Sequence, residues 1–331
     1  MSPGLWALLL LSSSCATKTS PVSDDSGGKL NESDADTDTD ADTDADADAD
    51  ADTDSGVSWP DNAWRQISVG GQHMCGTLRN GKALCWGRND YGQLNVPSGL
   101  WRQVSAAEYG TTCGLRLNGV PTCWGLEEVN GTPEHLVSMD YFDSGNAQQY
   151  ACGITDVGEI TCWGDPSHPR NFPTDQRFSM VSTSYGYACA LTRAGQIECW
   201  PSQRYYTPEP LEEAPPTGTF MDLCTADHFA CALRTDGTMA CWGEELTDWN
   251  AQDPSEPAPG TFLDVACEGA SRCEVSTDHD LSCAFPRSNG VILPSAEFVQ
   301  IAFGSAGFCG ILVDGSAACW DGVASPIPIP E

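Results

Sequence analysis

The sequence predicts an all-β fold made of seven small antiparallel sheets, and three observations support this prediction. The 331 residues include 33 glycines and 22 prolines, which is typical of a chain rich in turns. Of the 17 cysteines, 14 form seven pairs, and the two members of each pair are ten residues apart. Successive pairs begin 36 to 42 residues apart, so they mark a tandem repeat with a period near 40.

A period near 40 residues fits one blade of a β-propeller, because a blade is a small antiparallel sheet. We therefore predict a seven-bladed propeller over residues 58–331, with three or four short strands in each blade. The pairs are Cys75 with Cys85, Cys113 with Cys123, Cys152 with Cys162, Cys189 with Cys199, Cys231 with Cys241, Cys273 with Cys283, and Cys309 with Cys319. In six repeats a tryptophan follows the second cysteine and a glycine precedes it by four residues. The sixth repeat departs at both positions, with Ala284 and His279.

The spacing of ten places each pair on the two strands of one hairpin. In the first repeat Asn80-Gly81 is a turn signal, and a three-residue loop from Arg79 to Gly81 puts glycine in a left-handed conformation. Counting outward from this loop sets Cys75 opposite Cys85. Opposed residues of antiparallel strands have Cα atoms about 4.5–5.5 Å apart, within the range of a disulfide bond. We expect one disulfide within each hairpin and no metal site, because the repeats lack the closely spaced cysteine pairs typical of zinc.

A third strand is expected ahead of each hairpin. An aromatic residue lies eleven positions before the first cysteine in six repeats, and Trp101 is displaced by one in the second repeat. The six aromatic residues are Trp64, Tyr141, Phe178, Phe220, Phe262 and Phe298. Aromatic residues that recur in register are typical of core packing, so we expect them to be buried.

Two further cysteines, Cys224 and Cys267, fall in the first strands of blades five and six. Cys224 lies seven residues before the first paired cysteine of its blade, and Cys267 lies six before its own. Side chains alternate between the two faces of a strand, so this difference in parity points them to opposite faces of their sheets. Neighbouring blades stack face to face, and we therefore predict a disulfide between blades. The alternative is two small buried thiols.

The N-terminus resembles an export signal. Residues Leu5 to Leu11 form an apolar run that is too short to span a membrane but fits a signal peptide. Three serines and Cys15 follow, as in a bacterial lipoprotein signal whose cysteine becomes the lipidated first residue. No basic residue precedes the run and Ser12 stands where leucine is usual, so a plain secretory signal is the alternative. We predict a lipoprotein-type signal peptide over residues 1–15, with lipidation at Cys15.

Residues 16–57 are predicted to form a disordered acidic tether rich in Asp, Ala and Thr. Between Asp34 and Asp54, 11 aspartates alternate with Ala or Thr, so neither face is apolar and the charges repel one another. The tract lacks the glycine and closing glutamate of a calcium-binding loop. The whole chain has a formal charge of −32, which repels phosphate backbones, and we expect no nucleic-acid partner.

The first repeat resembles the regulator of chromosome condensation repeat. The matching pieces are Gly70-Gly71-x-His73, Asn80-Gly81, Trp86-Gly87 and Gly92-Gln93-Leu94. The resemblance covers residues 58–331 and implies a seven-bladed propeller. The eukaryotic founder of that family is a nucleotide-exchange factor for a small GTPase and binds chromatin, whereas secreted bacterial relatives include a protein that inhibits β-lactamase by binding it. No exchange-factor residue can be matched in this acidic chain, which resembles the bacterial short-repeat group.

No catalytic residue and no cofactor are predicted. The sequence contains no H-E-x-x-H, no P-loop, no G-x-S-x-G and no dinucleotide-binding fingerprint. The longest intervals between repeats contain loops 201–216 and 244–260, which carry Tyr205, Tyr206 and Trp249 among acidic residues. Aromatic residues on exposed loops can anchor a partner, so we predict that these three form a binding patch. The alternative is an ordinary solvated loop.

These features predict an exported, lipid-anchored propeller that acts as a scaffold for a protein or another cell-surface ligand at the cell envelope. We expect a monomer held at the outer membrane only by its N-terminal lipid, on the periplasmic face or the cell surface, with a secreted protein as the alternative. The alternative function is an extracellular carbohydrate-active hydrolase or lyase. A stacked aromatic residue with two convergent carboxylates at the central mouth would favour that alternative over the scaffold.

Overall fold

The structure is a computed structural model that describes residues 59–126, 133–143, 149–164, 172–184, 186–201, 214–243, 259–284, 293–320 and 326–327. The secondary structure of these residues consists of 22 strands. None of them forms a helix long and apolar enough to cross a membrane. The predicted signal peptide and tether lie outside the described residues.

Seven antiparallel sheets contain all described strands, and each sheet takes its strands consecutively from the chain. The first strands are β1 (Trp64–Val69), β4 (Trp101–Ala106), β7 (Leu136–Asp143), β10 (Phe178–Ser184), β13 (Phe220–Thr225), β16 (Phe262–Glu268) and β19 (Phe298–Gly304). The second strands are β2 (His73–Leu78), β5 (Thr111–Arg116), β8 (Gln149–Thr155), β11 (Tyr187–Thr192), β14 (Phe229–Arg234), β17 (Ser271–Ser276) and β20 (Gly307–Leu312). The third strands are β3 (Ala83–Gly87), β6 (Pro121–Gly125), β9 (Ile160–Gly164), β12 (Ile197–Pro201), β15 (Met239–Gly243), β18 (Leu281–Ala284) and β21 (Ala317–Trp320). The last sheet adds β22 (Pro326–Ile327).

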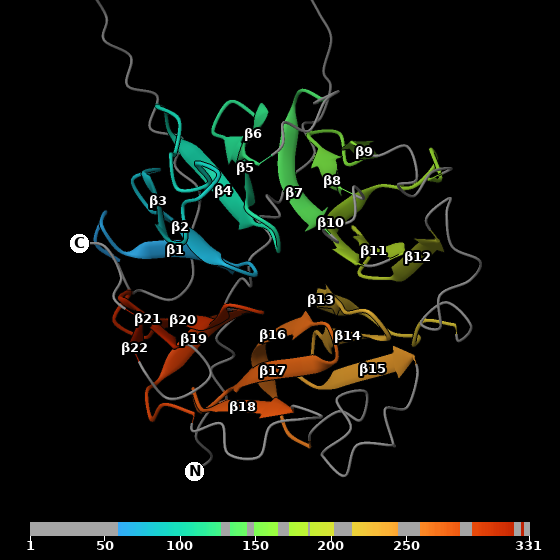
Figure 1. Cartoon of the computed structure of the whole chain (residues 1–331). Helices are drawn as coiled ribbons and strands as arrows, with labels where there is room; N and C mark the ends of the chain where they lie inside the picture. The colour runs from blue at the N-terminus through green and yellow to red at the C-terminus, as the bar shows by residue number, and fades with distance from the viewer. Residues whose placement is uncertain are drawn as a thin grey trace, which may run out of the picture. The chain divides into compact units, whose positions relative to one another are not determined.

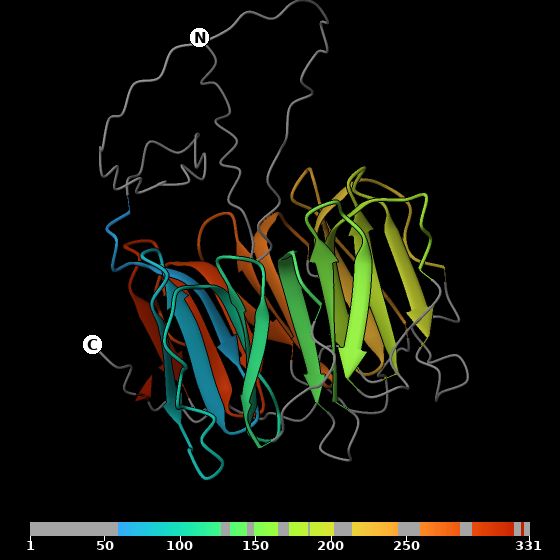
Figure 2. The ribbon, with the colours of Figure 1, turned by 90° about the horizontal axis from the view of Figure 1, so that it is seen from above.

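The seven sheets stand around a common axis as the blades of a propeller, with their first strands nearest to the axis (Figure 1). We number the blades one to seven in chain order. Figure 2 shows the blades from the side, with their strands running between two faces. The predicted all-β, seven-bladed propeller with three- to four-stranded blades is confirmed.

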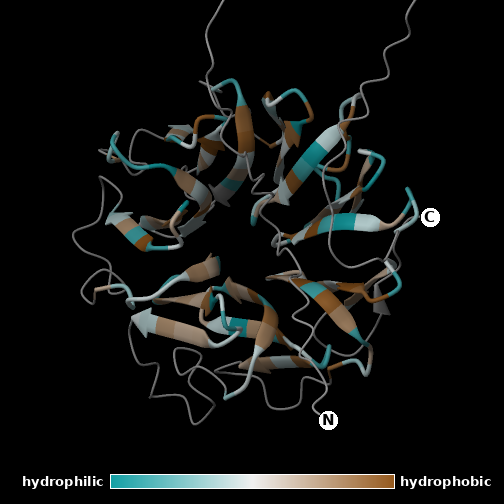
Figure 3. Cartoon of the chain, turned by 180° about the vertical axis from the view of Figure 1, so that it is seen from behind, coloured by the Kyte–Doolittle hydropathy of each residue, from teal (hydrophilic) through white to brown (hydrophobic). Residues whose placement is uncertain are grey.

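The two faces differ in which strands they connect. First and second strands join at one face, which we call the loop face, through segments such as 70–72 and 107–110. Second and third strands join at the opposite face, which we call the hairpin face, through turns such as the one at Gly81. Hydrophobic colour lies mainly along the strands and hydrophilic colour mainly at their ends (Figure 3).

The residue that begins each first strand is buried in all seven blades, and it is aromatic in six. In blades one, two, four and seven its ring lies against the tryptophan after the second cysteine, with ring centroids 5.2 to 5.8 Å apart. In blade three this position is Leu136, so the prediction that Tyr141 fills it was wrong. Tyr141 lies further along β7, opposite Ala151, because the paired first and second strands of blade three, β7 and β8, are longer than those of the other blades.

A ring of backbone hydrogen bonds joins every blade to the next. The N–H of the residue that begins a first strand donates to the carbonyl of the preceding hairpin turn, over 2.7 to 3.0 Å. The pairs are Trp101–Gly81, Leu136–Gly119, Phe178–Gly158, Phe220–Gly195, Phe262–Gly237, Phe298–His279 and Trp64–Gly315. The Trp64–Gly315 bond joins blade one to blade seven, so the circle closes by the same contact that is used elsewhere.

Each hairpin contains the disulfide that its spacing predicts, with the two cysteines directly opposite each other in register and their Cα atoms 4.0 to 4.1 Å apart. The turn from Arg79 to Gly81 is also as expected, since Gly81 has a φ of 80° and its N–H donates to the Leu78 carbonyl. The intra-hairpin disulfides are therefore confirmed. They join Cys75 to Cys85, Cys113 to Cys123, Cys152 to Cys162, Cys189 to Cys199, Cys231 to Cys241, Cys273 to Cys283, and Cys309 to Cys319.

The two members of each bond differ in burial. The first cysteine of every pair is fully buried, because it lies on the central strand of its sheet. The second cysteine lies on the third strand and is partly exposed in six pairs, at Cys85, Cys123, Cys162, Cys199, Cys241 and Cys283. Only Cys319 is buried as well, and β22 pairs with its strand there. The disulfides therefore tie the third strand of each blade to its buried second strand.

Blade six replaces the tryptophan with a buried ion pair. Arg272 stands opposite Ala284, the residue at the tryptophan position, and both Arg272 and Glu274 are fully buried. Their side chains lie 3.1 Å apart, Nε to Oε2. His279 takes the place of the turn glycine with a φ of 68°, and its carbonyl still accepts from Phe298. Blade six thus keeps the backbone contact to the next blade, but a buried ion pair takes the place of the tryptophan.

Candidate binding site on the propeller axis

A cavity of about 620 Å³ lies on the axis and is lined by the first strands of all seven blades. Its lining includes five acids from four blades, namely Glu108, Asp140, Asp222, Asp227 and Glu268. The described lining contains no lysine or arginine, and its other polar side chains are mostly hydroxyls of serine and threonine. The cavity therefore offers negative charge and hydrogen-bond acceptors to a molecule that enters it.

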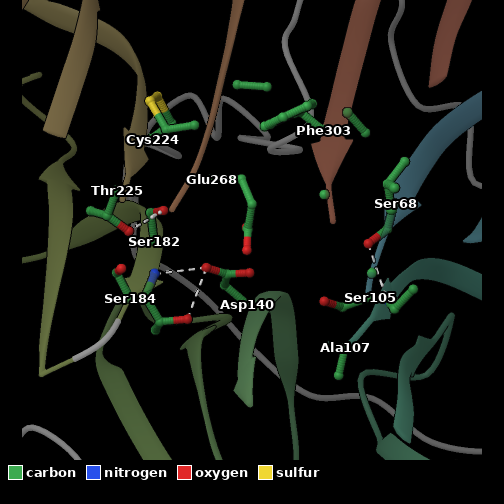
Figure 4. Close-up of a pocket in the computed structure, with 18 of the residues that line it drawn as sticks. Ser68, Ser105, Ala107, Asp140, Ser182, Ser184, Cys224, Thr225, Glu268 and Phe303 are labelled. Atoms are coloured by element: carbon green, nitrogen blue, oxygen red, sulfur yellow. Dashed lines mark hydrogen bonds between the residues drawn. A yellow bond between two sulfur atoms is a disulfide. The ribbon is translucent and has the colours of Figure 1, made fainter. Parts of the chain in front are cut away.

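One register position ties neighbouring blades together around this cavity. In each case, the residue of a first strand that lies opposite the first paired cysteine of its blade contacts the first strand of the following blade. The contacted residue is the last or next-to-last residue of that strand. These links are Ser68–Ala106, Asp140–Thr183, Ser182–Thr225 and Cys224–Cys267. The first three are hydrogen bonds of 2.9, 2.7 and 3.0 Å, whereas Cys224 and Cys267 form a disulfide with Cα atoms 5.5 Å apart. The wall of the cavity is therefore fixed by contacts between blades, as Figure 4 shows for several of them.

Glu268 is the last residue of β16, and its carboxylate points into the cavity toward Asp140 (Figure 4). Enclosure by the cavity walls, together with the charges of Glu108, Asp227 and Asp140, raises the pKa of Glu268 to about 8. Burial also raises the pKa of Asp227, although His228 and a hydrogen bond with Ser184 oppose that rise. Near neutral pH this end of the cavity therefore favours a bound proton or another cation.

Asp140 has a different role from Glu268. Its Oδ2 accepts from the Thr183 N–H at 2.7 Å and from the Thr183 hydroxyl at 2.9 Å. These bonds hold its carboxylate in the link between blades three and four, so Asp140 contributes charge to the cavity from a fixed position.

Asp222 and Asp264 form a buried carboxyl pair at another inter-blade contact. Asp264 accepts a hydrogen bond of 2.6 Å from the Ile301 N–H of blade seven. Burial raises the pKa of Asp264 well above its ordinary range, and the neighbouring Asp222 raises it further. In blade one the equivalent residue is Gln66, whose amide both donates to and accepts from Val104 of the next blade. The pair is therefore best explained as a protonated substitute for this amide contact.

Three large exposed side chains, which we call the aromatic rim, lie on the loop face next to the acids. Tyr91, Tyr109 and Leu126 are 49%, 43% and 41% exposed, and Tyr109 also lines the cavity. Gly110 holds them together, since the Leu126 N–H donates to its carbonyl and a Cβ there would lie 2.7 Å from the Tyr91 ring. Tyr109 therefore borders the axial cavity, and Tyr91 and Leu126 lie beside it through their contacts with Gly110.

The glycines of the first repeat explain how Glu108 reaches this mouth. A Cβ on Gly71 would lie 2.2 Å from the Glu108 carbonyl, and the Gly71 N–H donates to Ala107. His73 follows, buried, with its Nε2 at 2.8 Å from the Thr112 hydroxyl. Burial lowers the pKa of His73 to about 4, so the ring is neutral and structural at physiological pH.

The predicted binding residues Tyr205, Tyr206 and Trp249 and the predicted lipidation site Cys15 lie outside the described residues. Sequence reasoning missed the cavity acids Glu108, Asp227 and Glu268. Each lies four or five residues before the first paired cysteine of its blade, and that shared offset was the available signal. Within the described ranges, no three His, Cys, Asp or Glu side chains are placed to hold one metal ion.

The fold and the site define a disulfide-bridged propeller with an acidic axial cavity. The family model of the regulator of chromosome condensation (RCC1) repeat matches residues 64–93, which confirms the family resemblance of this repeat protein.

Solved structures share the propeller fold with this chain. The CRINKLY WD40 ectodomain of the Arabidopsis thaliana receptor kinase ACR4 has a TM-score of 0.64 and 21% identity, covering 81% of this chain and 98% of that one. The ectodomain of the Physcomitrella patens receptor kinase CR4 has a TM-score of 0.60 and 18% identity, covering 78% and 73%. Human WBSCR16 has a TM-score of 0.56 and 12% identity, covering 74% and 85%. At these identities the similarity concerns the fold alone.

Proposed function

We propose that this chain is an exported propeller that binds a protein partner at the cell envelope through its loop face. The aromatic rim carries the proposal, because Tyr91, Tyr109 and Leu126 expose apolar area side by side on a rigid scaffold. Exposed clusters of large apolar side chains typically mark interaction surfaces, and tyrosine is enriched among residues that dominate binding energy. A framework fixed by disulfides and inter-blade bonds binds with little loss of backbone freedom.

The disulfides also support export. Eight disulfides join described residues, and such bonds persist in oxidising compartments. In this proposal Cys15 carries the lipid anchor at the outer membrane and residues 16–57 form the tether. A flexible chain of that length separates its ends by about 35 Å, and charge repulsion extends it further. The propeller would then reach a partner at some distance from the membrane.

The test compares matched apolar residues on the two faces. Full-length protein captures partners from envelope extracts of the cells that make it, and affinity for the main captured protein is measured. Tyr91→Ala and Tyr109→Ala should each weaken binding about tenfold or more, in the range of interface anchors. Leu117→Ala and Val157→Ala, exposed by 42% and 54% on turns of the hairpin face, should leave it unchanged. Equal affinity in all four variants would reject the loop face as the binding surface.

Tyr205, Tyr206 and Trp249 extend this proposal to the long segments after blades four and five. The triple alanine variant should weaken the same complex. Full affinity in that variant would remove these three residues from the binding surface while leaving the rim in place.

One observation favours a second candidate function, a carbohydrate-active hydrolase or lyase. The same cavity contains two carboxyl groups with raised pKa, Glu268 and Asp227, together with Tyr109. A carboxyl group that stays protonated near neutral pH can act as a general acid. Release of reducing ends from a panel of polysaccharides, abolished by Glu268→Gln, would establish this activity, and no release by the wild-type protein would reject it.

A further inference from the structure

We infer that the axial cavity receives a lysine or arginine side chain of the bound partner, with Glu268 as its main contact. This inference rests on the proposed function, because the loop face that would hold the partner surrounds the mouth of the cavity. It adds the chemistry of the partner, which must present a basic residue at the centre of its binding surface.

The charge of the cavity is the first argument. Besides Asp222, which belongs to the carboxyl pair with Asp264, four acids from blades two, three, five and six line it, and the described lining residues include no lysine or arginine. These carboxylates are spread around the wall, so they suit an elongated cation surrounded by several acceptors. Electrostatic complementarity of this kind steers a partner and sets its register.

An unpartnered carboxylate inside the cavity is the second argument. Among the described residues, the Glu268 carboxylate has no hydrogen-bond or ion-pair partner, and it points into the open space (Figure 4). A carboxylate without a protein partner can accept charge-assisted hydrogen bonds from a cationic ligand, and these bonds add to the affinity of that ligand.

The environment of Glu268 is the third argument. The same burial and the same neighbouring acids that raise the pKa of Glu268 to about 8 create a strongly negative potential at its carboxylate. An ammonium or guanidinium group can replace the proton there and form a charge-assisted hydrogen bond. Tyr109 also lines this cavity, and an aromatic ring can add a cation–π contact to a bound cation. A volume of about 620 Å³ is ample for one long basic side chain with water.

The test uses small cations and full-length protein, so it does not depend on identifying the partner. Isothermal titration calorimetry measures binding of agmatine and of the peptide acetyl-Gly-Arg-Gly-amide, with acetyl-Gly-citrulline-Gly-amide as the uncharged control. Glu268→Gln removes the proposed contact. Asp278→Asn removes the same charge from an exposed hairpin turn of the same blade, and both variants retain the acidic tether.

Asp278→Asn should bind each cation as tightly as the wild type does. Glu268→Gln should bind each cation at least tenfold more weakly. The citrulline peptide should not bind. If Glu268→Gln loses the circular dichroism of the wild type, Glu108→Gln serves as the second variant with the same expectation. Equal binding to every variant, or no binding by the wild type, would overturn the inference.

The capture experiment separates this inference from the function on which it rests. A partner that depends on Tyr91 and Tyr109 but not on Glu268 would refute the cavity contact and keep the proposed function. If the cavity binds the cations but no captured partner depends on Tyr91 or Tyr109, the proposed function would be refuted and the cation site would stand.

Discussion

Cys224 and Cys267 form a covalent bond at the register position where Ser68 and Ala106 form a hydrogen bond. Cys224 stands opposite Cys231 as Ser68 stands opposite Cys75, and each reaches the first strand of the following blade. The disulfide therefore replaces a repeated polar contact between blades, and it closes a chain segment of 43 residues.

Removing this disulfide should lower stability without changing the fold. The double variant Cys224→Ser and Cys267→Ser should lose about 2–4 kcal/mol of unfolding free energy, as chain entropy predicts for a loop of this size. Urea denaturation under non-reducing conditions measures the loss. A change below about 0.5 kcal/mol would show that the bond contributes nothing beyond the hydrogen bonds found in the other blades.

The raised pKa of Glu268 predicts stability that falls with increasing pH. The unfolded chain releases this proton near pH 4.5, whereas the folded protein keeps it until about pH 8. The folded state thus binds more protons across that interval, and its stability decreases as pH rises through it. Asp227 and Asp264, whose pKa values are also raised, act in the same direction. Denaturation between pH 5 and 9 should show a shallower decline for Glu268→Gln, and identical slopes would contradict the assignment.

Closure of the ring should be sensitive to a methyl group at Gly315. Gly315 and Gly237 have nearly equal φ values of 82° and 85°, so alanine has a similar conformational cost at both, about 1–2 kcal/mol. At Gly315 the new Cβ would also lie 2.5 Å from the Trp59 ring and 2.8 Å from the Ala63 Cβ, whereas at Gly237 its nearest neighbour, in Thr261, is 3.2 Å away. Thermal unfolding should show a greater loss for Gly315→Ala than for Gly237→Ala. The opposite order would mean that closure does not depend on this contact.

The buried ion pair of blade six should be replaceable as a unit but not in parts. Arg272→Ala leaves Glu274 buried without its cation and should cost about 3–5 kcal/mol. The triple variant Arg272→Ala, Glu274→Ala and Ala284→Trp restores the residues found in blade five, and it should recover most of that loss. Chemical denaturation measures the unfolding free energy of the two variants. A triple variant as unstable as Arg272→Ala would show that tryptophan cannot replace the ion pair in blade six.

The fold could be predicted from the sequence because seven copies of one spacing amplify a weak local signal. A spacing of ten around a glycine turn fixes which residues face each other, and the structure has Cys75 opposite Cys85. The error at Tyr141 arose because counting back from Cys152 assumed that the first and second strands have the same length in every blade. In blade three the β7–β8 pair is longer.

The axial acids could not be predicted in the same way. Glu108, Asp227 and Glu268 share an offset of four or five residues before the first paired cysteine, but the other four blades have no acid at that offset, so the signal was weak. They form a site only because seven blades bring their first strands to one axis. The raised pKa values of Asp227 and Glu268 arise from that enclosure and from the charges around them, which is a property of the assembled ring.

The most direct test of the binding surface is site-specific photo-crosslinking in the cells that make the protein. Benzoylphenylalanine is placed at Tyr109 on the loop face, and at Leu117 on the hairpin face of the same blade. We expect a discrete crosslinked partner from position 109 and none from position 117. A partner crosslinked from position 117 alone would contradict it.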